Sequence, residues 1–191
     1  MLCVDRSDPT ATGAERAQDV LAFWREAGPS RWFRKDPAFD SAFRSRFLGA
    51  HEAARRGELD GWTQDAPGAL ALVLLLDQFP RNAFRGSARM FESDAQAREV
   101  ARRAVEAGFD QLTEPQLRNF FYLPFMHSED AADQARAVEL IRTLGGEPLR
   151  FALQHCDIIR KFGRFPHRNA VLGRSTSPAE QQFLDAGGFA G

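Results

Sequence analysis

Apolar residues recur along this chain with the spacing of amphipathic helices, and the alternating pattern of a half-buried strand hardly occurs. Phe39, Phe43 and Phe47 follow one another at intervals of four residues, which places three rings on one face of a helix. Residues 69–76 contain only Ala, Leu and Val, and the prevalence of Leu and Ala over β-branched residues favours a fully buried helix there. The pattern predicts an all-α fold.

Capping residues, prolines and glycines divide this pattern into about eight helices joined by short connections, which is typical of an antiparallel helical array. Capping boxes are predicted at Thr12–Glu15, Thr113–Gln116 and Ser177–Glu180. We expect residues 1–12 to be a flexible N-terminus and residues 13–191 to form a single all-α domain. The predicted helices cover residues 12–28, 36–57, 65–76, 93–108, 113–123, 128–144, 148–163 and a last one from residue 177.

Composition and charge exclude several classes of protein. The net charge is −1, with a pI near 6.4, which argues against a dedicated nucleic-acid binder. Residues 1–11 carry two aspartates and no apolar signal core, and the longest apolar run is far shorter than the roughly 18 residues of a membrane span. The two cysteines, Cys3 and Cys156, form no CxxC pair. We expect a cytoplasmic protein.

Two stretches have similar sequences and are rich in arginine. The first FP(H)RN segment is residues 79–86 (FPRNAFRG), and the second is residues 165–174 (FPHRNAVLGR). No carboxylate occurs between Asp77 and Glu92 or between Asp157 and Glu180. Guanidinium groups bind carboxylate or phosphate in a bidentate manner, so the two segments are candidate anion-binding loops. The structural alternative is that these arginines cap helices and pair with carboxylates of neighbouring helices.

A second candidate is the run from Phe120 to Asp130, where an aromatic stretch leads into His127, Ser128 and Glu129. Ser128 is a plausible N-cap for the next helix. That account leaves His127 unexplained, and His155 has a similar place on an apolar helical face. No HExxH occurs, and no histidine follows a glutamate by three residues, so the spacing predicts no metal site and no cofactor. Nor does the chain contain GxSxG, a GxxxxGK phosphate loop or a GxGxxG motif.

Five stretches together resemble the bacterial family known as domain of unknown function 924. They occur in the family's order and extend over nearly the whole chain from about residue 17. The resemblance implies an all-α fold like that of the tetratricopeptide-like helical superfamily, an α-α superhelix, and it implies no activity. No regular 34-residue repeat is found that would bring peptide binding with it. The stretches are Phe23-Trp24, Arg31-Trp32-Phe33, residues 75–82 (LLDQFPRN), residues 120–130 (FFYLPFMHSED) and residues 162–169 (FGRFPHRN).

Three hypotheses for the function follow, and the sequence leaves all of them open. In the first, the protein has a pocket for a small anionic ligand, either as a binding protein or as an enzyme, with His127 or His155 as acid or base. In the second, it is a helical interaction scaffold for an acidic peptide or a C-terminal carboxylate. A contact with RNA or DNA ranks last. In the first hypothesis the ligand-binding residues are Arg81, Asn82, Arg85, Arg164, His167, Arg168 and Asn169, and Arg81, Asn82, Arg168 and Asn169 come together in space.

Overall fold

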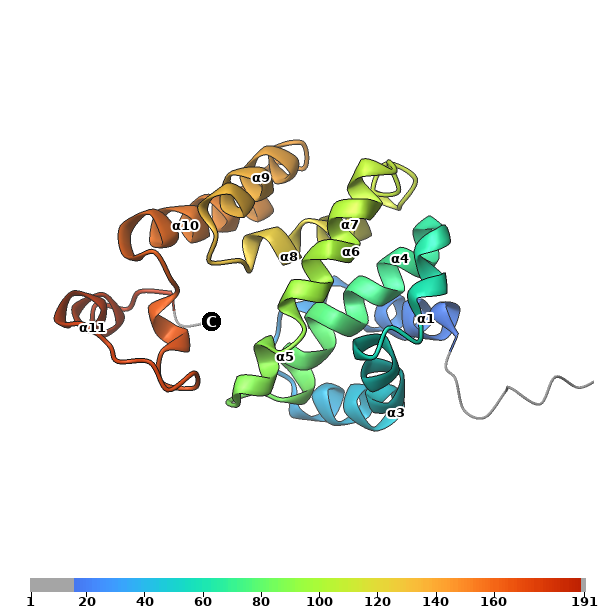
Figure 1. Ribbon diagram of the computed structural model, residues 1–191, viewed down its shortest axis with the longest axis horizontal. Helices are drawn as coiled ribbons and strands as arrows, with labels where there is room; N and C mark the ends of the chain where they lie inside the picture. The colour runs from blue at the N-terminus through green and yellow to red at the C-terminus, as the bar shows by residue number, and fades with distance from the viewer. Residues whose placement is uncertain (1–15, 190–191) are drawn as a thin grey trace, which may run out of the picture.

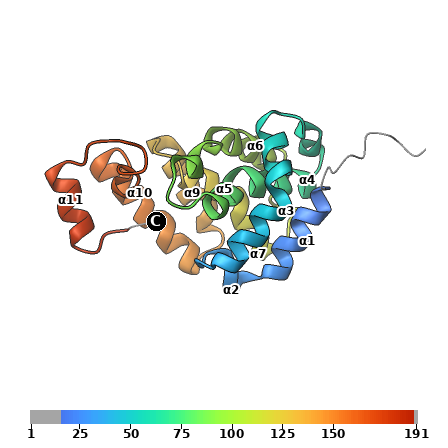
Figure 2. The same cartoon turned by 90° about the horizontal axis from the view of Figure 1, so that it is seen from below.

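The computed structural model describes residues 16–189, and this part of the chain is helical with no strand (Figures 1 and 2). The predicted all-α fold is confirmed. The α-helices are α1 (Ala17–Ala27), α2 (Pro29–Trp32), α3 (Pro37–Arg55), α4 (Ala66–Val73), α5 (Phe79–Ala83), α6 (Asp94–Glu106), α7 (Pro115–Arg118), α8 (Leu123–Met126), α9 (Ala131–Arg142), α10 (Gly146–Phe162) and α11 (Pro178–Asp185). Five short turns of other helix types connect them: η1 (Asp60–Gln64), the π-helical η2 (Leu74–Gln78), η3 (Ala88–Phe91), η4 (Asn119–Phe121) and η5 (Pro166–Arg168).

Helix α4 lies at the centre of the larger core, as its continuous apolar sequence predicts. It packs against α1, α6 and η4 (Figure 1), and residues 69–76 are all buried. Around it lies an aromatic cluster that includes Trp24 of α1, Phe43 of α3 and Phe120 of η4, all three fully buried. The rings at positions 39, 43 and 47 all face this core, because their spacing places them on one side of α3.

The C-terminal part of the described chain forms a separate, smaller apolar cluster. Ile158, Ile159 and Phe165 are its buried members, and three partly buried phenylalanines pack against them. Helix α11 lies at one end of the molecule in both views, on the opposite side from α1 (Figures 1 and 2). Helix α10 belongs to both clusters, because Ala152 lies in the larger core, and the polar residues described below lie where η5 meets α6 and the end of α8.

The first FP(H)RN segment is not a loop, contrary to the sequence prediction. Residues 66–83 run as one helix, in which α4 continues through the π turn η2 into α5. Pro80 has no backbone N–H to donate, and the widened π turn accommodates it without ending the helix. In the π turn, the N–H of Phe79 donates to Leu74 O, so Leu75 O loses its usual donor. Leu76 O also lacks its usual donor, because Pro80 has no N–H.

Side chains from three elements donate hydrogen bonds to the four successive carbonyls of residues 75–78. His51 Nδ1 donates to Leu75 O at 2.9 Å, and Ser93 Oγ donates to Leu76 O at 2.6 Å. Arg81 Nη1 donates to Asp77 O at 2.8 Å, and the Asn82 amide donates to Gln78 O at 2.8 Å. A buried carbonyl without a donor is costly, so these bonds hold α3, α6 and α5 to the π turn. Ser93 directly precedes α6, but its hydroxyl is used by Leu76 O and makes no capping bond to the N–H groups of that helix.

Other local predictions have mixed outcomes. The capping box of Ser177 and Glu180 is present, whereas Ser128 is not an N-cap: Asp130 caps α9 and Ser128 Oγ accepts the N–H of Asp130. The predicted flexible terminus, residues 1–12, and the capping box at residues 12–15 lie outside the described residues. The single-domain organisation and the regular superhelix stay predictions. No helix within residues 16–189 has the length and apolar character needed to cross a bilayer.

We expect Ser93→Ala to lower the free energy of unfolding by about 1–3 kcal/mol, because Leu76 O is left without this donor in a buried place. Urea denaturation measures the change. Ser45→Ala is the matched control, since Ser45 also bonds a helix carbonyl but is exposed, and it should change stability by less than about 0.5 kcal/mol. Equal effects of the two substitutions would contradict the role given to Ser93.

Candidate functional site

The two FP(H)RN segments meet at one carboxylate, that of Asp94 at the start of α6. Arg81 binds it with both terminal nitrogens, Nη1 to Oδ1 at 2.8 Å and Nη2 to Oδ2 at 3.0 Å. Arg168 approaches the same carboxylate from η5, with Nη1 at 3.7 Å from Oδ2. Both guanidinium groups also lie over the ring of Phe91. The structure therefore brings Arg81 and Arg168 together, although 87 positions separate them in the chain.

A buried aspartate–histidine pair lies beside the two arginines. His127, which follows α8, donates from Nδ1 to Asp77 Oδ1 at 2.7 Å, and the amide of Gln78 donates to the other oxygen at 2.6 Å. Burial raises the pKa of Asp77, but the charges of Arg81 and His127 and these hydrogen bonds outweigh it, so the pKa lies below its ordinary value. Burial and the charge of Arg81 lower the pKa of His127. A neutral His127 keeps its proton on Nδ1 and leaves Nε2 with a free lone pair.

Arg168 is the most enclosed of the site's cations. Only 7% of its surface is exposed, and its guanidinium lies between the rings of Phe91 and Phe165, 4.6 and 4.5 Å from their centroids. Nη2 donates to His127 O at 2.9 Å, whereas Nε is buried and has no hydrogen-bond partner within residues 16–189. Burial and the neighbouring charge of Arg81 lower the pKa of Arg168 to about 10, so the group stays charged at neutral pH.

Two further histidines border Arg168. His155 of α10 is 5% exposed and donates from Nδ1 to Phe151 O at 2.8 Å. His167 of η5 has a buried Nδ1 without a partner in the described part of the chain. Burial and then the charge of His127 lower the pKa of His155 to about 4, and burial and then the charge of Arg168 lower that of His167 to about 4. The histidines are therefore uncharged at neutral pH.

The other predicted ligand residues are engaged elsewhere. Arg85 forms an ion pair with Asp40 of α3, with Nε at 2.6 Å from Oδ2, and Arg164 holds Glu180 of α11 at the same distance. Asn82 bonds Gln78 O and accepts from Arg85. Asn169 accepts from Arg174 and donates to Thr176. No described contact joins the two asparagines, so the expectation that they meet at one ligand with Arg81 and Arg168 stays a prediction. The structural alternative explains Arg85 and Arg164.

Several residues of the site were not predicted. The sequence pattern did not indicate a role for Asp77 or Asp94, because a carboxylate next to an apolar helix has no characteristic spacing. Glu129 accepts from Phe165 N at 2.8 Å and pairs with Arg174, with Oε2 at 2.7 Å from Nη1, and so holds the second FP(H)RN segment. The acid-free stretch around Arg168 thus finds its counter-charges on α6 and just before α9.

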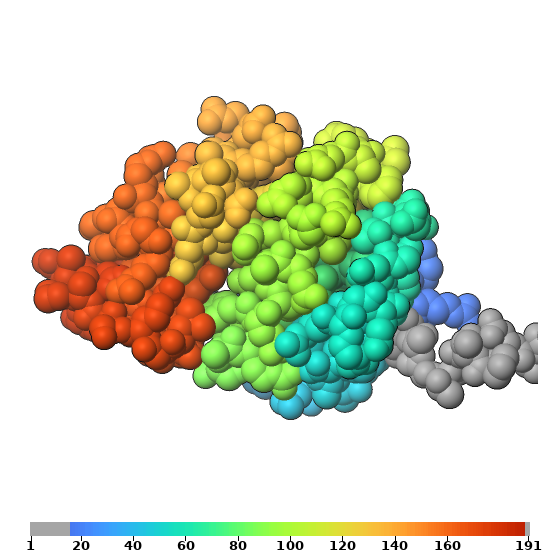
Figure 3. Space-filling view, viewed as in Figure 1, coloured from blue at the N-terminus to red at the C-terminus, as the bar shows by residue number. Residues whose placement is uncertain are grey.

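The space-filling view shows a narrow hollow where three segments meet: the yellow segment near residue 127, the green segment near residue 90 and the red-orange segment near residue 168 (Figure 3). His127 and Arg81 keep 15% and 14% of their side chains exposed, so the polar site can be reached from solvent. A groove of about 630 Å³ lies elsewhere, along α10, and does not include Arg81, His127 or Arg168. The site is a small opening in a packed polar layer.

Two comparisons with known proteins decide the family. The sequence profile described as bacterial protein of unknown function (DUF924) matches residues 20–188. The chain belongs to the DUF924 family. A solved structure of a protein of unknown function from Agrobacterium tumefaciens is similar to it, with 54% sequence identity and a TM-score of 0.88, and the match covers 89% of this chain and 97% of that chain.

No curated protein matches the chain. The resemblance to DUF924 inferred from the five stretches is confirmed. Neither the DUF924 family nor the Agrobacterium tumefaciens structure comes with a described activity.

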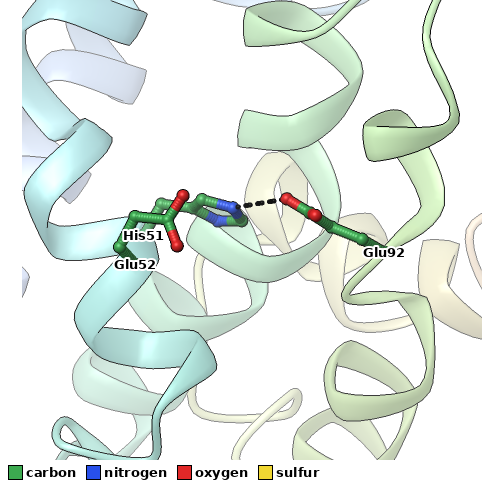
Figure 4. Close-up of side chains that lie close together, drawn as sticks. All are labelled: His51, Glu52 and Glu92. Carbon is green, nitrogen blue, oxygen red and sulfur yellow. Dashed lines mark hydrogen bonds and ion pairs between the residues drawn. The ribbon is translucent and has the colours of Figure 1, made fainter.

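One group of side chains in the described DUF924 chain has the proximity that a metal ion needs. The ligand atoms of His51, Glu52 and Glu92 lie within 4.8 Å of one another (Figure 4). Arg55 and Arg89 already form ion pairs with both carboxylates. A cation there would have to overcome two guanidinium charges, so this group gives little support to a metal centre. Sequence spacing could not have found it, because His51 and Glu52 lie on α3 whereas Glu92 lies in the turn after η3.

We expect the free energy of unfolding to fall by about 2 kcal/mol between pH 7 and pH 5 through His155 alone. Its folded pKa of about 4 lies below the ordinary value of 6.5. The unfolded chain therefore binds a proton first, and stability that is complete above about pH 6.5 is lost as the pH falls toward 4. Urea denaturation at several pH values measures this slope. His155→Asn, which keeps a donor but cannot titrate, should flatten it, and an unchanged slope in that variant would contradict the assignment.

Proposed function

We propose that this protein binds a small anionic ligand, a carboxylate or phosphate compound, at the hollow formed by Arg168, Arg81 and His127. The proposal rests above all on Arg168. A buried guanidinium without a full set of partners is expensive, because its charge has been taken out of water. The nearest carboxylate atom is 3.7 Å away and Nε has no partner among the described residues. An anion in the hollow would supply what is missing.

The arrangement around Arg168 favours an ordered site over a solvated surface charge. Two phenyl rings, of Phe91 and Phe165, fix the plane of the guanidinium, and the hydrogen bond from Nη2 to His127 O fixes its position beside His127. Cation–π contacts of this kind hold a cation in place without neutralising its charge. Arg168 makes no hydrogen bond to a carboxylate within residues 16–189, whereas Arg81, Arg85 and Arg174 each make one.

His127 gives the site a group capable of accepting a proton. Asp77 binds Nδ1 and so fixes both the tautomer and the orientation of the ring, as an aspartate does for the histidine of a hydrolase triad. The opposite nitrogen, Nε2, makes no hydrogen bond within residues 16–189. This pair would allow the protein to act as an enzyme on an anionic substrate, with His127 as the base.

The interaction scaffold is a second candidate, and one observation favours it. The groove of about 630 Å³ along α10 is lined mainly by apolar side chains, among them Leu153, which is 45% exposed. Such a surface suits an apolar or amphipathic peptide better than an acidic one, because the groove brings only a few cations. RNA or DNA binding ranks last, since most arginines of the two FP(H)RN segments already have carboxylate partners.

We expect small phosphate or carboxylate compounds to raise the melting temperature of the wild-type protein, because a ligand that binds only the folded state stabilises it. Arg168→Lys should abolish this shift. Lysine keeps the charge but lacks Nε and the flat group that lies between Phe91 and Phe165. Differential scanning fluorimetry with a panel of anions measures the shift, and far-UV circular dichroism verifies that the variant is folded.

Arg160→Ala is the matched control, because Arg160 lies in the same acid-free stretch but pairs with Asp157 on the surface. It should leave the anion-induced shift unchanged. A panel that produces no shift with the wild-type protein would contradict anion binding, and binding of apolar peptides in that case would favour the scaffold.

A further inference from the structure

The hydrogen-bonding groups left over at the hollow are of two kinds. Arg168 Nε is a donor without an acceptor. Nε2 of His127 and Nε2 of His155 are acceptors without a donor, because Nδ1 of each ring already donates, to Asp77 and to Phe151 O respectively. The positively charged groups that act on these two rings are Arg81 and Arg168, and the negatively charged groups are Asp77 and Asp94. His167 beside them is uncharged at neutral pH. With the rings neutral, the two arginines and the two aspartates balance each other.

These leftover groups restrict the chemistry of the anion. A carboxylate has acceptor oxygens only at neutral pH, since its pKa is about 4. It would satisfy Arg168 but would turn further oxygen lone pairs toward the lone pairs of the imidazoles. A phosphate monoester has a second pKa of about 6, so below that pH most of it carries a donating P–OH as well as charged oxygens. It supplies both kinds of partner in one group.

We infer that the ligand of this site carries a phosphate monoester group, which accepts hydrogen bonds from Arg168 and donates its P–OH proton to Nε2 of His127. This inference rests on the proposed function and names its substrate class. His127 is chosen over His155 because it is the more exposed of the two rings, and because its own backbone carbonyl holds Arg168 beside it. Binding uses the monoanion, so the bound group keeps its proton.

The sharpest test compares two probes of the same shape, methyl phosphate and methyl sulfate. At pH 5.5 methyl phosphate is mostly a monoanion with one hydroxyl, and methyl sulfate is a monoanion with none. We expect isothermal titration calorimetry to show methyl phosphate binding about tenfold more tightly, the effect of one hydrogen bond to a buried acceptor. The preference should shrink above about pH 6, as methyl phosphate loses its proton. Methyl sulfate affinity should stay constant over the same range.

Substitution of the acceptor should remove the preference selectively. His127→Asn keeps an amide that can donate to Asp77 but lacks the Nε2 lone pair, so it should bind the two probes about equally. Arg160→Ala, which removes a surface arginine paired with Asp157, is the control and should keep the preference for methyl phosphate, and His155→Asn tests the other ring. If the His127 variant does not fold, ¹⁵N-histidine spectra of the wild-type protein give the same information. Addition of methyl phosphate should shift Nε2 of His127 toward the hydrogen-bonded range, whereas methyl sulfate should not.

The outcomes separate this inference from the proposed function. Equal binding of the two probes by the wild-type protein, or tighter binding of methyl sulfate, would overturn the phosphate inference while leaving anion binding in place. A preference that His155→Asn removes and His127→Asn keeps would also overturn it, because the acceptor would be the wrong ring. Binding of neither probe, nor of any other anion in the panel, would overturn both.

Discussion

The burial of the Asp77 carboxylate is the constraint on which the rest of this structure depends. A carboxylate out of water persists only if charges and hydrogen-bond donors surround it. Asp77 obtains them from Gln78, Arg81 and His127. The π turn makes this possible, because it rotates the end of the apolar helix and accommodates Pro80 in the same helix. A regular α-helix through residues 74–78 would place these side chains differently relative to α8 and η5.

From Asp77 the polar contacts spread to the elements that pack around it. Arg81 bridges Asp77 and Asp94, Arg168 lies beside Asp94, and His127 O holds Arg168. The charges of the four ionised groups cancel when the histidines are neutral. The depressed pKa values of the histidines follow from the same arrangement, because burial and the arginines both disfavour a further positive charge there. Charge balance and proton affinity are therefore two consequences of one network.

Helical periodicity and capping patterns were sufficient to predict the all-α fold, because the apolar faces of α3 and α4 are continuous and strong. They could not predict that Pro80 lies within a helix, since a single-sequence pattern does not reveal a π turn. The arginine-rich segments pointed to Arg81 and Arg168, which the structure brings to one carboxylate, and also to Arg85 and Arg164, whose partners Asp40 and Glu180 lie on other helices. Which arginine is neutralised depends on tertiary contacts, and sequence spacing carries no information about them. The same limit hid Asp77 and Asp94.

Residues 165–174 of the C-terminal segment contact the rest of the molecule through polar groups, although apolar residues lie nearby on both sides. The C-terminal segment packs its own phenylalanines together, Arg168 contacts Asp94 of α6 and the His127 carbonyl after α8, and Arg174 pairs with Glu129 just before α9. If stability were the only requirement, apolar packing would serve as well or better, since buried ion pairs rarely outperform it. A network with a purely structural role would also be expected to satisfy its buried groups. Arg168 Nε and His167 Nδ1 have no partner within residues 16–189, and both belong to the same three-residue turn. The proposed ligand is supported by the position of these two groups beside the oriented His127, because four other buried side-chain atoms in residues 16–189 also lack a partner.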